Sequence, residues 1–181
     1  MIAIQGDFEK HISAIRSVGG EAVEVRTQED FTGVDRAIIP GGESTTVGML
    51  MDRFGLGATL KEKAALGLPI WGTCMGMILM AHEVDRREQY TLDLLDITIK
   101  RNAFGAQVHS FEDEIMIRGL EEPVMGVFIR APVVTRLGVG VDTLAEYDGR
   151  VVAVRKGNLI GTSFHPELTE DTRMHSWFMG L

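Results

Sequence analysis

The clearest evidence for the fold class is the stretch Leu68-Pro69-Ile70-Trp71-Gly72-Thr73-Cys74-Met75-Gly76. Residues 68–72 form an apolar run typical of a strand that is buried on both faces of a parallel sheet. The run passes directly into residues 74–83, whose apolar pattern predicts a helix. A buried strand followed at once by a helix is the repeating unit of α/β folds, so we expect this chain to belong to that class.

Short apolar runs alternate with helical patterns through the first half of the chain, which is typical of βαβ units in a parallel sheet. Strands are predicted at 2–5, 21–26 and 35–40, and helices at 8–18, 45–54 and 58–66. Later strands are predicted at 94–101, 110–118, 124–130, 144–147, 151–155 and 159–164, with a closing helix over 170–179. Because no repeat, low-complexity segment or linker interrupts the pattern, we expect one domain over residues 1–181.

Composition and charge exclude several classes of protein. The 181 residues are 45% hydrophobic and 24% charged, which is enough for a buried core and excludes a disordered or collagen-like chain. The net charge of −8 would repel a phosphate backbone, so we expect no nucleic-acid partner. Residues 69–81, the longest apolar-rich stretch, are too few to span a membrane, and we expect neither a membrane partner nor a signal peptide. The single cysteine indicates a reducing compartment, so a cytoplasmic location is expected.

Cys74 lies in the pattern G-x-C-x-G, which is typical of a nucleophile elbow. In such an elbow a sharp turn between a strand and a helix raises a reactive atom above the edge of the sheet. The flanking Gly72 and Gly76 permit the strained turn and the close approach of neighbouring elements. The alternative interpretation is a buried structural cysteine, since free Cys is among the most buried residue types. The elbow context favours a nucleophilic thiol.

A nucleophilic thiol needs a base, and one of the five histidines has a context that favours this role. His165 follows a predicted strand, at the position where open α/β sheets place their ligand sites. Glu167 lies two residues farther along, so its carboxylate can reach the imidazole nitrogen that does not face the thiol. That is the orienting role of the acid in a catalytic triad. The other histidines are interpreted as solvated or core residues: His11, His82, His109 and His175.

Residues 40–46 read Pro-Gly-Gly-Glu-Ser-Thr-Thr and follow the strand predicted at 35–40. The two glycines can direct backbone N–H groups at one point, which a developing oxyanion requires, and the N–H of Met75 would be a second donor. The alternative is an ordinary turn with Ser44 or Thr45 as the helix N-cap, and composition alone favours it. The dinucleotide fingerprint, the P-loop and the zinc-binding HExxH pattern are absent from the sequence, so we expect neither a cofactor nor a metal.

Several segments together resemble a known family. In chain order they are Gln5-Gly6, PGGESTT at 40–46, GTCMGM at 72–77, RNAFG at 101–105, FIRAP at 128–132 and SFHPEL at 163–168. They are similar to the glutaminase subunits of pyridoxal 5′-phosphate synthase, which are class I, triad-type glutamine amidotransferases. The chain departs from the family in two places: its first strand begins several residues late, and Ala106 stands where a basic residue is expected.

The resemblance implies a three-layer α/β sandwich with a mainly parallel central sheet, the flavodoxin-like fold of class I glutamine amidotransferases. It implies hydrolysis of L-glutamine to L-glutamate and ammonia through a thioester on Cys74, with His165 as base and Glu167 orienting the imidazole. The oxyanion hole would use Gly42 and Met75, and the glutamine site would include Gly42, Glu43, Ser44, Arg101, Ile129 and Arg130. The ammonia would pass to a separate synthase subunit, the expected protein partner.

Two other functions stay open at this point. Another Cys-His-Glu thiol hydrolase, such as a γ-glutamyl peptidase, would keep the elbow but would have no need for Arg101 and Arg130 together with the PGGES segment. A non-catalytic regulatory subunit would bind the synthase without hydrolysing glutamine. The filled positions of the triad disfavour this second alternative.

Overall fold

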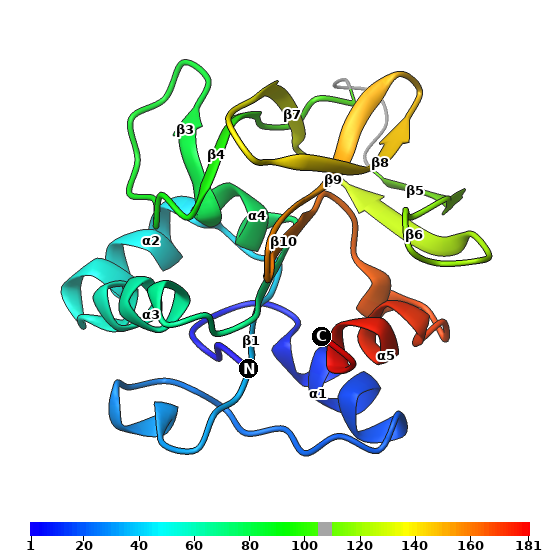
Figure 1. Ribbon diagram of the computed structural model, residues 1–181. Helices are drawn as coiled ribbons and strands as arrows, with labels where there is room; N and C mark the ends of the chain where they lie inside the picture. Colours follow the sequence, from blue (N-terminus) through cyan, green and yellow to red (C-terminus); the bar gives the residue numbers. More distant parts are fainter. Residues whose placement is uncertain (105–109) are drawn as a thin grey trace.

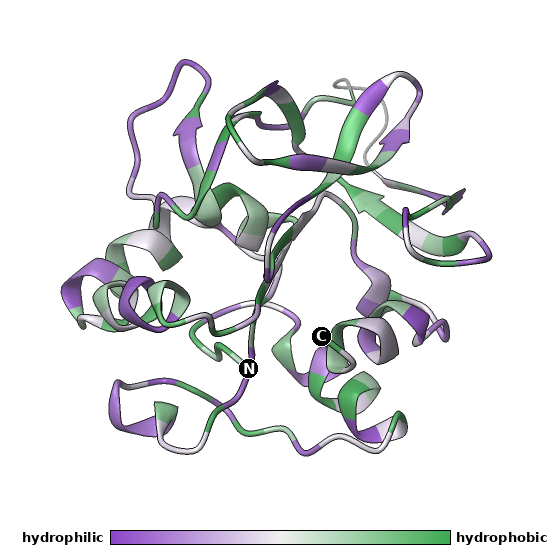
Figure 2. Ribbon diagram, viewed as in Figure 1, coloured by the Kyte–Doolittle hydropathy of each residue, from purple (hydrophilic) through white to green (hydrophobic). Residues whose placement is uncertain are grey.

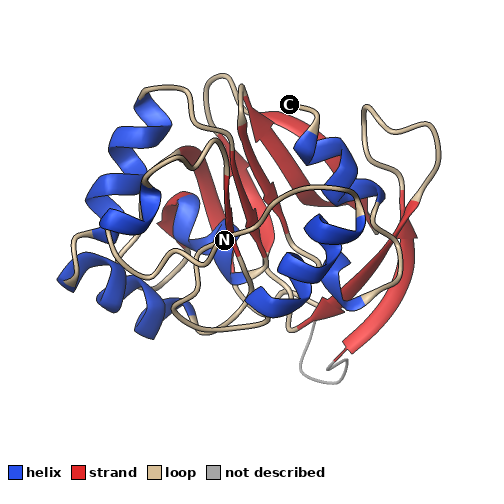
Figure 3. Ribbon diagram, turned by 90° about the horizontal axis from the view of Figure 1, so that it is seen from below, coloured by secondary structure: helices blue, strands red, loops and turns tan. Residues whose placement is uncertain are grey.

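A central sheet with helices on both faces organises the molecule, as Figures 1 and 3 show. The structure is a computed structural model that describes residues 1–104 and 110–181. Its strands are β1 (Ala37–Ile39), β2 (Ile70–Thr73), β3 (Ala81–Val84), β4 (Leu95–Lys100), β5 (Ser110–Ile115), β6 (Val124–Ile129), β7 (Val133–Leu137), β8 (Asp142–Tyr147), β9 (Arg150–Lys156) and β10 (Leu159–Thr162). Its α-helices are α1 (Phe8–Ser17), α2 (Ser44–Arg53), α3 (Leu56–Ala65), α4 (Met75–Met80) and α5 (Arg173–Met179), and two short 3₁₀ helices are η1 (Glu29–Phe31) and η2 (Pro166–Leu168).

The main sheet has eight strands in the order β1-β2-β10-β9-β7-β4-β3, with β8 beside β9, and β5 and β6 form a separate pair. The part that carries the elbow is parallel, since β2 pairs in parallel with both β1 and β10. Beyond β1, the N–H of Ile2 donates to the carbonyl of Ile38, and Ile2 forms a parallel bridge with Val25. The segments at Val25, Ile2, β1, β2 and β10 therefore follow the flavodoxin-like strand order. The fold class expected from the sequence is confirmed.

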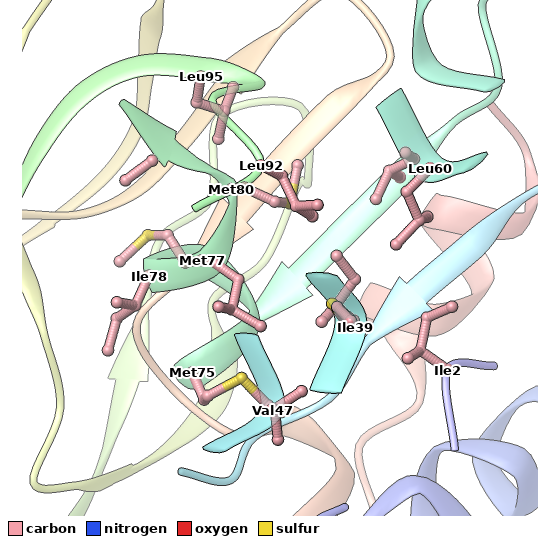
Figure 4. Close-up of a cluster of buried hydrophobic side chains, with 14 of the residues drawn as sticks. Ile2, Ile39, Val47, Leu60, Met75, Met77, Ile78, Met80, Leu92 and Leu95 are labelled. Carbon is pink, nitrogen blue, oxygen red and sulfur yellow. The ribbon is translucent and has the colours of Figure 1, made fainter. Parts of the chain in front are cut away.

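The parallel strands alternate their side chains between two cores. Trp71 of β2 packs in the core that contains residues of α1 and α5. The adjacent Ile70 packs in the core beneath α2, α3 and α4, where Ile39, Leu60 and Met77 also lie (Figure 4). Hydrophobic residues dominate α4 as well, and all of its residues are buried (Figure 2). Because both faces of these strands are covered, they read in the sequence as continuous apolar runs.

Four segments differ from the predicted elements. The strands predicted at 2–5 and 21–26 are reduced to the single bridge between Ile2 and Val25. The helix predicted over 74–83 ends at Met80, and Ala81–Val84 forms β3 beside β4. The last carbonyls of this helix accept hydrogen bonds from Leu92 and Leu94, so a distant segment ends the helix. β7 has no predicted counterpart, because only its first two residues are buried and its pattern is too weak to identify.

Two residues named from the sequence, Ala106 and His109, lie outside the described residues. Within residues 1–104 and 110–181, no helix is both long enough and apolar enough to cross a membrane. The antiparallel strands β7, β8 and β9 and the β5–β6 pair all come from the second half of the chain and lie at the top of Figure 1, away from the N-terminus.

Candidate active site

Cys74 occupies the turn between β2 and α4 with a strained backbone. Its φ is 48° and its ψ is −101°, a conformation that non-glycine residues rarely adopt. The N–H of Cys74 donates to the carbonyl of Thr162 on β10 at 2.7 Å, and the carbonyl of Cys74 accepts from the N–H of Ile78 at 3.3 Å. Hydrogen bonds on both sides thus hold the sulfur-bearing residue in its strained turn.

The two glycines of the elbow are required by close packing. A β-carbon at Gly72 would lie 2.5 Å from the carbonyl carbon of Gly76. A β-carbon at Gly76 would lie 2.0 Å from the carbonyl oxygen of Ile39 on β1. Larger residues at either position would push α4 away from the sheet. The predicted need for small residues on both sides of Cys74 is confirmed.

His165 and Glu167 form a buried pair beside the elbow. Nδ1 of His165 lies 2.7 Å from Oε1 of Glu167, and the two residues are 6% and 5% exposed. The N–H of His165 donates to the carbonyl of Val127 at 2.8 Å, so β6 fixes the backbone that carries the imidazole. Cys74 and His165 line the same cavity, and the thiol contributes to the raised pKa of this imidazole. Cys74, His165 and Glu167 therefore have the connectivity of a catalytic triad.

The electrostatics of this pair favour a protonated imidazole and an ionised carboxylate. Burial lowers the pKa of His165, but the hydrogen bonds to Cys74 and Glu167 and the charges of both groups outweigh it and raise the pKa to about 10. Burial likewise raises the pKa of Glu167, but the attraction of His11 and the hydrogen bond with His165 outweigh it, so this pKa falls below its usual range. Each partner thus stabilises the charge of the other.

The loop at Gly42 is held against the N-terminal segment. Gly42 has a φ of 152°, which favours glycine, and a β-carbon there would lie 3.3 Å from Cε of Met75. The carbonyl oxygen of Gly41 lies against Gly6, where a β-carbon would approach it to 1.8 Å. The N–H of Glu43 donates to Oε1 of Gln5 at 3.4 Å. The Gln5-Gly6 segment therefore supports the loop that is predicted to supply an oxyanion donor.

Glu43 is the N-cap of α2, and the alternative interpretation of Ser44 or Thr45 as the cap is wrong. The carboxylate of Glu43 accepts from the N–H of Thr45 at 3.1 Å and from the N–H of Thr46 at 2.8 Å. These two bonds satisfy N–H groups that the first helical turn leaves free. Chiefly through the bond from Thr46, they lower the pKa of Glu43 to about 2.

Cys74 and His165 line a cavity of about 430 Å³. The cavity is also lined by every residue predicted to bind substrate, which are Gly42, Glu43, Ser44, Arg101, Ile129 and Arg130. Met75, the second predicted oxyanion donor, lines it too, and Glu167 lies behind His165. The structure thus brings all the predicted site residues together around one opening.

Gln89 is a residue of this region that the sequence does not reveal. Its Oε1 accepts from Nη1 of Arg101 at 3.2 Å and from the hydroxyl of Ser44 at 3.3 Å. Nη2 of Arg101 lies 3.6 Å from Oε1 of Glu43, so the arginine is held from two sides. No local pattern around residue 89 indicates this contact, because its partners come from distant segments.

Two further histidines lie close to the acid of the triad. Nε2 of His11 is 3.2 Å from Oε2 of Glu167, and His175 lies behind His11. Both histidines are fully buried, so of the two interpretations left open for them, solvated or core, the core interpretation holds, although their contact with the site was not foreseen. His82 is exposed on β3 and pairs with Asp93 at 2.8 Å. In the part of the chain that the structure describes, no group of three or more His, Cys, Asp or Glu residues could hold a metal ion.

Comparison with known proteins gives the family of this chain. The family model "SNO glutamine amidotransferase family" matches residues 1–180. The chain is 50% identical over 179 residues to "Pyridoxal 5'-phosphate synthase subunit PdxT" of Methanothrix thermoacetophila, covering 99% of the chain and 96% of the relative. It is 45% identical over 181 residues to the protein of the same name from Niallia circulans, covering 100% of the chain and 95% of the relative.

A solved structure described as "Crystal structure of glutamine amidotransferase" is similar over the whole fold. It has a TM-score of 0.95 and 45% identity, and the match covers 99% of this chain and 95% of the other. The sequence, the fold and the Cys-His-Glu geometry all indicate a glutamine amidotransferase. The chain belongs to the SNO glutamine amidotransferase family.

Proposed function

We propose that this chain hydrolyses L-glutamine to L-glutamate and ammonia and delivers the ammonia to a synthase subunit for the synthesis of pyridoxal 5′-phosphate. The observation that carries the hydrolysis is the connected set of Cys74 on its strained turn, His165 and Glu167, with 2.7 Å between Nδ1 and Oε1. The synthase partner rests on relatives named as pyridoxal 5′-phosphate synthase subunits, which match the chain over nearly its full length.

In the first half-reaction His165 takes the proton of the Cys74 thiol, and the sulfur attacks the side-chain amide carbon of glutamine. The carbonyl oxygen becomes an oxyanion, which the N–H groups of Gly42 and Met75 would stabilise. The C–N bond then breaks, and His165 gives a proton to the departing nitrogen, so ammonia leaves and a γ-glutamyl thioester remains. The raised pKa of His165, about 10, supports this role because the imidazole holds a proton beside Cys74.

In the second half-reaction water attacks the thioester. His165, now neutral, removes a proton from the water, and the C–S bond breaks to give glutamate and the free cysteine. Glu167 keeps Nδ1 protonated throughout, so that Nε2 of His165 faces the reacting atoms. The net reaction consumes one water and one glutamine and produces one glutamate and one ammonia.

The far end of glutamine carries an α-carboxylate and an α-ammonium group. Arg101 and Arg130 are the guanidinium groups that line the cavity, and either can bind the carboxylate. Glu43 offers an ionised carboxylate for the ammonium group, although two N–H groups of α2 already bond to it. Ser44 and the backbone of Gly42 and Ile129 would complete the glutamine site.

Two alternatives belong to other functional classes. A γ-glutamyl peptidase would use the same triad, but the two arginines of the cavity fit the free carboxylate of an amino acid. A regulatory subunit without activity would not need the strained turn at Cys74. We also propose that residues 1–181 act as a single domain in the cytoplasm, which the single free cysteine supports, with no nucleic-acid or membrane partner.

Ammonia release from glutamine tests the proposal, measured for the chain alone and after mixing with the synthase subunit. The mixture is expected to release ammonia, and Cys74→Ala is expected to abolish the release while the fold persists. The Cys74→Ala mixture should still form pyridoxal 5′-phosphate from added ammonium salts. Release at the wild-type rate by Cys74→Ala would remove the thiol from the mechanism. Preferential cleavage of γ-glutamyl peptides would favour the peptidase.

A further inference from the structure

A pair of buried histidines lies directly behind the triad. His11 comes from α1 and His175 from α5, two helices that lie against each other (Figure 1). Nδ1 of His11 is 2.9 Å from Nε2 of His175. Nε2 of His11 is 3.2 Å from Oγ1 of Thr73 and 3.2 Å from Oε2 of Glu167. The two histidines thus extend the row of polar groups that begins at Cys74.

The charge of Glu167 determines where the protons of this pair lie. An ionised carboxylate only accepts hydrogen bonds, so the nitrogen of His11 that faces it, Nε2, carries the proton. Nδ1 of His11 is then an acceptor, and Nε2 of His175 must donate to it. This arrangement leaves Nδ1 of His175 as a buried acceptor, consistent with its lack of a partner among the described residues.

Both histidines act as neutral dipoles rather than as cations. Burial lowers the pKa of His11 to about 4, even against the attraction of Glu167, and lowers the pKa of His175 to about 3. The indole of Trp71 packs on both rings, with centroid distances of 5.8 Å to His11 and 5.1 Å to His175. In this buried, largely apolar surrounding the effective dielectric constant is low, so the imidazole dipoles act strongly on the carboxylate of Glu167.

The second oxygen of Glu167 depends on this pair. Oε1 of Glu167 accepts the hydrogen bond from Nδ1 of His165, whereas Oε2 is buried with no aligned hydrogen-bond donor among the described residues. The N–H of His11 is aligned with the Thr73 hydroxyl, and Nε2 of His11 lies 3.2 Å from Oε2, so the imidazole attracts that oxygen electrostatically, without an aligned hydrogen bond. A carboxylate held at one oxygen alone can rotate and release the imidazole.

We propose that His11 is a positioning residue for the triad, holding Oε2 of Glu167 so that Oε1 stays on His165, and that His175 keeps His11 in the required tautomer. The inference deepens the proposed glutaminase function and rests on it. His11 affects the orientation of His165 and not the binding of glutamine, since neither His11 nor His175 lines the cavity.

Kinetics of glutamine hydrolysis in the mixture with the synthase subunit test this role. His11→Leu is expected to lower kcat by about tenfold, the lower end of the cost of removing a group that orients a metal-ligating histidine, with KM unchanged. In His11→Gln an amide N–H can take the place of Nε2–H, so we expect most of kcat to be kept. His175→Leu is expected to lower kcat as well, but less than His11→Leu.

A double-mutant cycle separates positioning from a general structural effect. If His11 acts through the carboxylate, His11→Leu lowers kcat in the wild type but not in the Glu167→Gln background. Phe178→Leu is the matched control, because Phe178 lies on α5 and packs on Trp71 at 5.5 Å without touching the histidines' hydrogen bonds. This control is expected to lower Tm and to leave kcat unchanged.

The proposal is overturned by wild-type kcat in folded His11→Leu, by an equal loss in both backgrounds, or by an equal loss in His11→Gln. If His11→Leu does not fold, His175→Leu in the two backgrounds gives the same test with the same criteria. Failure of the glutaminase function has a different signature, because wild type and Cys74→Ala would then release ammonia equally. When the inference alone fails, these two proteins still differ.

Discussion

Gly41 lies directly against the imidazole of His165. A β-carbon at position 41 would be 2.3 Å from Cε1 of His165 and 3.0 Å from its Nδ1. The first glycine of the PGGESTT segment is therefore required by the base of the triad, whereas Gly42 is favoured by its φ of 152°. The two adjacent glycines serve different physical needs.

Gly41→Ala is expected to displace the imidazole and to lower the kcat of glutamine hydrolysis. A displacement of about 1 Å in a catalytic group commonly costs about 100-fold in rate. Gly180→Ala is the matched control, because a β-carbon there would have its nearest contact at 3.5 Å and the backbone φ is −91°. Wild-type kcat in Gly41→Ala would show that His165 can move aside without cost.

Substitutions in the triad should follow a definite order. His165→Asn is expected to lower kcat nearly as much as Cys74→Ala, because the members of a triad act as a unit. Glu167→Gln should cost about tenfold less, since the imidazole remains, although it loses its ionised partner at 2.7 Å. Steady-state ammonia release by the three variants gives the order. Equal activity of His165→Asn and wild type would refute the assignment of the base.

Arg101→Ala and Arg130→Ala are expected to raise KM for glutamine more than they lower kcat. Both guanidiniums line the cavity, and if they bind the α-carboxylate they contact the ground state and the transition state equally. Gln89→Leu removes the acceptor that holds Arg101 at 3.2 Å. This substitution should also raise KM, but by less than Arg101→Ala does. An effect on kcat alone would indicate a role in assembling the site.

Docking of the synthase subunit is expected to raise the glutaminase activity of the chain. The peptide between Gly41 and Gly42 can rotate if the Gly41 carbonyl leaves its contact with Gly6, which would turn either a carbonyl or an N–H toward Cys74. A bias of about 3 kcal/mol toward the N–H state would raise the competent population on the order of a hundredfold. Gly42→Val should suppress the rise, because its φ of 152° disfavours a side chain. Full kcat from the isolated chain would contradict this gating.

The stability of the fold is expected to fall as the pH drops from 6.5 toward 4. The pKa of His11 is lowered from 6.5 to about 4, so in this window the unfolded chain binds a proton that the folded chain does not. Each such group contributes a slope of about 1.4 kcal/mol per pH unit, and His175 adds to it. Carboxyl groups such as Glu167 contribute in the same direction, at lower pH.

Urea unfolding at pH 6.5, 5.5 and 4.5 measures this slope. His11→Leu should reduce it, whereas Phe178→Leu should lower the free energy of unfolding equally at every pH. His165 has the opposite sign: its pKa is raised to about 10, so its contribution is complete below pH 6.5 and is lost as the pH rises toward 10. A slope unchanged in His11→Leu would show that this histidine is not the group that titrates.

The sequence by itself determined the fold class, the elbow and the pairing of His165 with Glu167. These features depend on residues that are close in the chain. Gly72 and Gly76 flank Cys74, and Glu167 follows His165 by two positions. The backbone there turns into the 3₁₀ helix η2 instead of staying extended as expected, yet Oε1 of Glu167 still lies 2.7 Å from Nδ1 of His165. The glutamine-site residues followed from a family resemblance, and the structure gathers them around one cavity. Local spacing was enough to predict the elbow and the His-Glu pair because the residues of each lie within a few positions of one another.

Only the tertiary structure decided which distant groups support that site. His11 and His175 are 164 positions apart, and their burial on amphipathic helices looks the same in sequence whether or not they face a carboxylate. The contacts of Gln89 with Arg101 and the end of α4 at Met80 likewise depend on segments that meet only after folding. The periodicity of apolar residues indicates which side of a helix or strand is buried. Which residues pack against that side depends on how the layers of the fold are arranged.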